Sequence, residues 1–177
     1  AAAGWAFWVQ RDDTPLEHLI PGSHKAGMAL PDLLERRTRI AGAPIWDALP
    51  PEWELAAFRE QMTSDFGLPE WVLNNLVGRR SYLFANDLDA FSDPVFLTKM
   101  SSVGVILERF SRFSGMTEQD YAGGLNLRYR EDASLYYATR GRVLTVSPSR
   151  DALVSALTLA PGESWDEAAM SAAFEAA

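Results

Sequence analysis

The stretch 134–160 constrains the fold more than any other part of the chain. Two runs, 135–140 and 143–147, are rich in β-branched and aromatic residues that alternate along the chain, and a short turn containing Gly141 separates them. Strands of period two joined by a glycine-containing turn are typical of a β-hairpin. The sequence therefore predicts two paired strands at this point.

A helix is predicted directly after this hairpin. Ser147 is expected to cap the helix, and Pro148 is expected at its first position, where the missing N–H has no cost. The apolar residues that follow recur at helical spacing. They are Leu153, Ala156, Leu157 and Ala160. This part of the chain predicts a scaffold and contains no catalytic pattern.

The rest of the chain predicts further strands and helices by the same rules. Strands are expected at 24–30, 80–87, 95–101 and 125–130, and helices at 31–40, 52–66, 69–77 and 103–113. The segment 115–124 is expected to be a loop. Hairpins outnumber crossover connections, so the sheet should be mainly antiparallel with helices packed on one face. The predicted fold class is α+β.

The helix predicted at 103–113 has a wide apolar face. Its members are Val103, Ile106, Leu107, Phe110 and Phe113.

Composition narrows the classes of function. The chain has 177 residues, enough for a single core, and its formal net charge is −8. An acidic surface repels phosphate backbones, so nucleic-acid binding is not expected. Cysteine is absent, which excludes thiolate metal sites and disulfides. The two histidines, His18 and His24, lack the spacing of a helical metal pair, and no metal or cofactor is expected.

The segment 1–9 is apolar and contains two tryptophans before the chain becomes polar at Gln10. We interpret it as the end of a membrane-spanning helix, with Trp5, Phe7 and Trp8 at the membrane interface. A short segment docked on the core, or an artificial extension, is the alternative.

The remaining organisation follows from this interpretation. We expect a linker at 10–22, one α+β domain at 23–160 and an acidic tail at 161–177, whose pattern suggests that the chain continues.

Candidate catalytic patterns fail on spacing. Asp87, Asp89 and Asp93 resemble the start of a calcium loop, but Ser92 and Thr98 occupy the positions that require glycine and glutamate. Ser23 lies in no nucleophile elbow, and the glycines at 123–124 form no phosphate-binding loop. A hydrolase based on paired carboxylates is the weakest hypothesis, because it needs a geometry that sequence does not show.

Three tryptophans lie near predicted helix starts, namely Trp46, Trp53 and Trp71. Core packing is one interpretation, and a partner-binding surface is the other.

The order of elements around Gly78, together with the segment 147–153 that leads into the last helix, resembles bacterial extracytoplasmic proteins of unknown function. In those proteins the extracytoplasmic domain follows a single N-terminal membrane helix. The resemblance implies a domain on the periplasmic side of the inner membrane, with no assigned activity and with chain beyond residue 177.

The leading hypothesis is a non-catalytic, membrane-anchored accessory subunit of a membrane protein complex, which contacts the lipid bilayer through its N-terminal segment. The alternative is a soluble module that binds a small apolar ligand between sheet and helices, in a large apolar pocket with a few inward polar groups.

Overall fold

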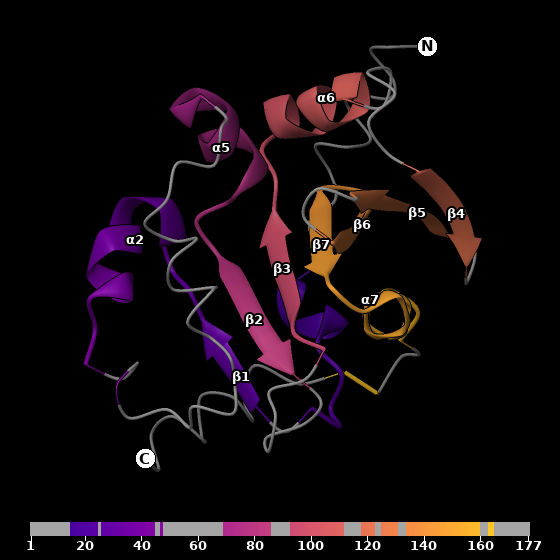
Figure 1. The fold of residues 1–177 in the computed structure, drawn as a ribbon, viewed down its shortest axis with the longest axis horizontal. Helices are drawn as coiled ribbons and strands as arrows, with labels where there is room; N and C mark the ends of the chain where they lie inside the picture. Colours follow the sequence, from indigo (N-terminus) through magenta and orange to yellow (C-terminus); the bar gives the residue numbers. More distant parts are fainter. Residues whose placement is uncertain are drawn as a thin grey trace.

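A seven-stranded antiparallel sheet lies at the centre of the protein, with strand order β1-β2-β3-β7-β6-β5-β4 (Figure 1). The computed structural model describes residues 15–24, 26–44, 47, 69–85, 93–111, 118–122, 125–130, 134–159 and 163–164. The strands are β1 (Ala26–Ala29), β2 (Ser81–Ala85), β3 (Val95–Lys99), β4 (Glu118–Ala122), β5 (Leu125–Arg130), β6 (Leu135–Arg140) and β7 (Val143–Ser147). The predicted α+β class and antiparallel sheet are confirmed.

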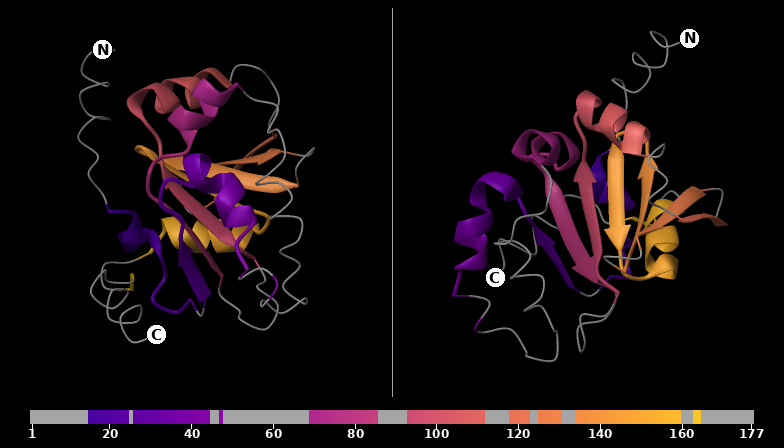
Figure 2. Two further views of the ribbon diagram at one scale, coloured as in Figure 1. Left: turned by 90° about the vertical axis from the view of Figure 1, so that its left-hand side faces the viewer. Right: turned by 45° about the horizontal axis from the view of Figure 1, so that its top comes forward.

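The sequence predicted helices on one face of the sheet, but helices lie on both faces. The described helices are the 3-10 helix η1 (Leu16–Leu19) and the α-helices α2 (Leu33–Ala41), α5 (Glu70–Leu76), α6 (Ser102–Ser111) and α7 (Arg150–Leu157). Helix α7 and η1 share one hydrophobic core with alternate residues of β2, β3 and β7. Helices α2, α5 and α6 pack on the intervening residues, which point to the opposite face (Figure 2).

Burial along β2 reflects this two-sided cover. The sequence predicted a strand in which Tyr82 and Phe84 alternate with Leu83 and Ala85, and all residues of Ser81–Ala85 are buried. Tyr82 and Phe84 face η1 and α7, whereas Leu83 and Ala85 face α2. A strand that is covered on both sides has no solvent-facing row.

The pairing of β3 with β7 joins the two halves of the sheet. Phe96 lies opposite Val146, and Lys99 lies opposite Val143, in antiparallel register. The first half holds β1, β2 and β3, and the second half holds β7, β6, β5 and β4.

The hairpin predicted at 135–147 is confirmed, with Gly141 in its turn at a φ of 58°. The predicted helix cap was wrong by two residues. Ser149 caps α7, and its Oγ accepts a hydrogen bond from the Ala152 N–H. Ser147 remains in β7, because the helical conformation is unfavourable for a residue that precedes proline. The Oγ of Ser147 accepts a hydrogen bond from the Ser149 N–H.

Two other boundaries differ from the sequence prediction. Helix α2 begins at Leu33 and not at Pro31, because the Asp32 N–H donates to the Arg79 carbonyl and Asp32 adopts a left-handed conformation with φ of 50°. Strand β4 forms where a loop was expected. Its sequence shows no alternation, and it pairs at the sheet edge with β5.

The predicted linker, 10–22, contributes to the core over the part that the structure describes. Leu16, Leu19 and Ile20 are buried. Gly22 N–H donates to the Glu163 carbonyl at 2.7 Å, so a described part of the predicted tail lies against the same segment. The predicted helix at 52–66 lies outside the described residues.

Candidate functional site

Helix α6 directs its apolar side to solvent. Val103, Ile106 and Phe110 are 48%, 42% and 68% exposed. The apolar face predicted from sequence is therefore present, but it does not pack on the sheet as a face of this kind usually does. Leu107 is half-buried, and Phe113 lies outside the described residues.

Trp71 adds a large exposed side chain on the neighbouring helix α5. It is 57% exposed, and α5 packs beside α6 at one end of the sheet (Figure 1). Of the three tryptophans considered for partner binding, Trp46 and Trp53 lie outside the described residues. We call Trp71, Val103, Ile106 and Phe110 together the apolar surface.

Asn75 joins the two helices that carry the apolar surface. Its Nδ2 donates to the Trp71 carbonyl at 2.7 Å, and its Oδ1 accepts from the Ser101 hydroxyl at 2.5 Å. The Asn75 carbonyl also accepts from the Ser101 N–H at 2.9 Å. Ser101 Oγ in turn accepts from the Gly104 N–H in the first turn of α6. The end of α5 is thus bonded to the start of α6.

Two glycines allow this close approach. A Cβ atom on Gly104 would lie 2.0 Å from the Asn75 carbonyl oxygen, and one on Gly78 would lie 2.1 Å from the Lys99 carbonyl oxygen. Both obstacles are backbone atoms, which cannot rotate away as a side chain can. The contacts of α5 with α6 and of Gly78 with β3 therefore require residues without side chains.

A buried ion pair explains the orientation of α6. Glu108, on the sheet-facing side of the helix, pairs with Arg128 of β5, and both side chains are buried. The Arg128 guanidinium also lies 5.7 Å from the centre of the Tyr137 ring. Because Glu108 binds the sheet, most of the apolar residues of the helix are left on the outer side.

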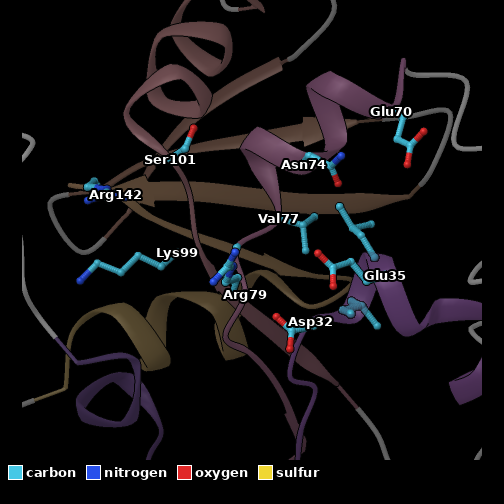
Figure 3. A pocket seen from close by; sticks show the side chains of 12 residues that line it. Asp32, Glu35, Glu70, Asn74, Val77, Arg79, Lys99, Ser101 and Arg142 are labelled. Carbon is cyan, nitrogen blue, oxygen red and sulfur yellow. The ribbon is translucent and has the colours of Figure 1, made fainter.

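A cleft of about 570 Å³ lies beneath α5, between the start of α2 and the turn that joins β6 to β7 (Figure 3). Its charged lining residues are Asp32, Glu35, Glu70, Arg79, Lys99 and Arg142. Ser101 and Asn74 add neutral polar groups, and Leu33 and Val77 add apolar surface. The alternative hypothesis called for a large apolar pocket between sheet and helices with a few inward polar groups, whereas this cleft is lined mainly by polar and charged residues.

The remaining candidate residues show no convergent chemistry within the described ranges. His18 is exposed, and His24 is buried with its Nδ1 bonded to the Pro21 carbonyl at 2.5 Å. Asp93 is exposed, and Asp87 and Asp89 lie outside these ranges. No group of three metal-binding side chains occurs where the structure describes the chain.

The N-terminal membrane prediction falls on Trp5, Phe7 and Trp8, which are outside the described residues. In the part that is described, every helix is too short or too polar to cross a bilayer.

Comparisons of the chain with protein-family models, curated proteins and solved structures found no match. The resemblance to extracytoplasmic proteins therefore stays a prediction.

Proposed function

We propose that the protein is a non-catalytic interaction domain, an accessory subunit of a membrane protein complex, and that its apolar surface binds an apolar helix of a partner subunit. The observation that carries this proposal is the exposure of Val103, Ile106 and Phe110 along one side of α6. Single exposed apolar residues are common, but several exposed along one side of a helix are typical of an interaction site.

The spacing of the exposed residues favours a helical partner. Val103, Ile106 and Phe110 are separated by three and then four residues, the spacing of the contact seam between two packed helices. A partner helix would place its own apolar residues between them, as in complexes in which an amphipathic helix lies in a groove.

The rigid support of the apolar surface favours binding without large rearrangement. The hydrogen bonds of Asn75 and the close contact at Gly104 hold α5 and α6 together before any partner arrives. A surface that is ordered in advance loses less conformational entropy on association, which raises affinity for a given contact area.

Charge favours a partner that carries basic residues beside its apolar helix. The chain has a formal net charge of −8, so long-range attraction accelerates its encounter with a basic protein and opposes its approach to an anionic lipid surface. The N-terminal segment 1–9 would supply the membrane anchor.

Site-specific photo-crosslinking tests the proposal. A photoreactive phenylalanine analogue replaces Phe110, and the matched control carries the analogue at Ser155, which is exposed on α7. Crosslinked peptides are identified from membranes by mass spectrometry. We expect position 110 to crosslink to an apolar helical segment of another protein, and we expect this segment to be flanked by basic residues. Position 155 should give no such crosslink.

A charged substitution on the same surface completes the test. Ile106→Glu should abolish the crosslink from position 110 and release the partner, whereas Ser155→Glu should leave both unchanged. Crosslinks only to residues 1–9 of the same chain, to a second copy or to lipid would overturn the proposed partner.

A further inference from the structure

The charged residues of the cleft beneath α5 are separated by sign. Figure 3 shows Lys99 and Arg142 toward one end, and Glu35 and Glu70 toward the other, with Arg79 and Asp32 between them. The basic end belongs to the end of β3 and the β6–β7 turn, and the acidic end belongs to α2 and α5.

Hydrogen bonds of the sheet fix the basic end. Arg142 Nε donates to the Met100 carbonyl at 2.9 Å, and the Met100 N–H donates to the Arg142 carbonyl at 2.8 Å. Lys99 lies next to Met100, at the end of β3, and Ser101 follows as the residue that caps α6. The backbone that carries these three polar side chains is therefore held in place.

The acidic end is fixed by a separate set of bonds. The Asp32 N–H donates to the Arg79 carbonyl at 2.7 Å, which joins the start of α2 to the segment before β2. The Gly78 N–H donates to Thr98 Oγ1 at 2.8 Å, which joins the end of α5 to β3. The two ends of the cleft are thus connected through β3 and keep their spacing.

We propose that this cleft binds a short peptide with free termini, whose carboxylate lies at the Lys99 and Arg142 end and whose ammonium lies at the Glu35 and Glu70 end. The lining holds three acidic and three basic side chains, so a simple anion or cation would use the favourable charge of one end only. A dipolar ligand meets favourable charge at both ends, and charge-assisted hydrogen bonds are the strongest available to it.

The size of the cleft also suits a short peptide. Its volume of about 570 Å³ lies in the range of pockets that hold small organic ligands. Asn74 can bond peptide groups between the termini, Ser101 Oγ can accept one further bond from a peptide N–H, and Leu33 and Val77 can contact small apolar side chains. This inference is independent of the apolar surface and of its partner.

Three related probes test the inference by NMR titration of the isotope-labelled full chain. The probes are tri-alanine with both termini free, N-acetyl-tri-alanine and tri-alanine amide. We expect tri-alanine to shift the amide resonances of the residues that line the cleft. Each blocked probe should bind about tenfold more weakly, the factor expected for loss of one charged contact.

Charge-removing variants assign the two ends. Glu35→Gln should weaken tri-alanine binding about tenfold and leave N-acetyl-tri-alanine unchanged, since that probe has no ammonium for Glu35 to bind. Lys99→Gln should weaken tri-alanine to a similar degree and leave tri-alanine amide unchanged. Arg39→Gln and Asp151→Asn, at exposed positions that do not line the cleft, are the matched controls and should have no effect.

The inference is overturned by equal affinity for the three probes, by shifts confined to residues outside the cleft, or by no shift with tri-alanine. If Glu35→Gln left tri-alanine amide unchanged and Lys99→Gln left N-acetyl-tri-alanine unchanged, the site would still be dipolar. The proposed orientation of the ligand would then be overturned.

Discussion

Glu108 of α6 and Arg128 of β5 form an ion pair that is buried between the helix and the sheet. The pair ties Glu108 to the sheet, on the side of α6 that also buries Val105. Val103, Ile106 and Phe110 consequently face solvent, and the surface on which we base the proposed function depends on this contact.

Removing one member of this pair should destabilise the domain strongly. We expect Glu108→Leu to lower the free energy of unfolding by about 3–5 kcal/mol, because it leaves the Arg128 charge buried without its carboxylate. Urea denaturation measures this change. The double variant Glu108→Leu/Arg128→Met should recover most of the loss, because apolar groups of similar volume replace both charges. Equal losses in the single and double variants would show that the charges are not responsible.

Gly104→Ala should destabilise the domain, although alanine normally favours a helix interior over glycine by about 1 kcal/mol. The added Cβ would lie 2.0 Å from the Asn75 carbonyl oxygen and would force α5 and α6 apart. We expect a loss of about 1–3 kcal/mol in the free energy of unfolding, which is typical of overpacking. Ser155→Ala, at an exposed position of α7, is the control and should be neutral or slightly stabilising. A gain in stability for Gly104→Ala would contradict the close contact.

The helix cap assigned to Ser149 can be tested in the same way. Ser149→Ala should lower the free energy of unfolding by about 1 kcal/mol, because the Ala152 N–H loses its acceptor. Ser149→Asp should keep the stability of the original chain, since aspartate caps equally well and its charge is favourable at a helix start. Thermal unfolding followed by circular dichroism distinguishes the two. If aspartate destabilises as much as alanine, Ser149 is not acting as the cap.

Truncation of two residues on α6 should have very different effects on the free energy of unfolding. Phe110→Ser is expected to change the free energy of unfolding by no more than about 0.5 kcal/mol, because Phe110 is exposed. Val105→Ala should cost about 1.6 kcal/mol, from roughly 0.8 kcal/mol for each buried methyl-sized group, because Val105 is buried. Chemical denaturation of both variants is the measurement. A large loss for Phe110→Ser would mean that the side chain packs within the domain and is not part of a free interaction surface.

Local signals in the sequence predicted the elements well where neighbouring residues determine them. The β6–β7 hairpin follows from alternation and from Gly141, and its pairing is as expected. Strand β4 was missed because it depends on its pairing with β5 at the sheet edge and not on its own pattern.

The direction of α6 could not be predicted from its periodicity. The pattern locates an apolar face, and the usual rule places that face against the core. Here the deciding interaction involves Arg128, which comes much later in the chain and shows no pairing signal with Glu108. Exposure of Trp71, by contrast, agrees with the partner-binding interpretation of the sequence, although binding itself stays a prediction.

The cleft was not visible in the sequence. Asp32, Arg79, Lys99 and Arg142 belong to four separate segments, and only the sheet and the hydrogen bonds at its ends bring them together. No spacing rule connects residues that are this far apart along the chain.

The pairing of β3 with β7 has a consequence for synthesis on the ribosome. Strands β1 to β3 emerge first, and the partner of β3 emerges only after α6, β4, β5 and β6. Until then β3 presents an unpaired strand edge, of the kind that attracts other chains. The nascent chain is therefore most exposed to misassociation while the middle of its sheet is still being translated, and protection by a chaperone would matter most in that interval.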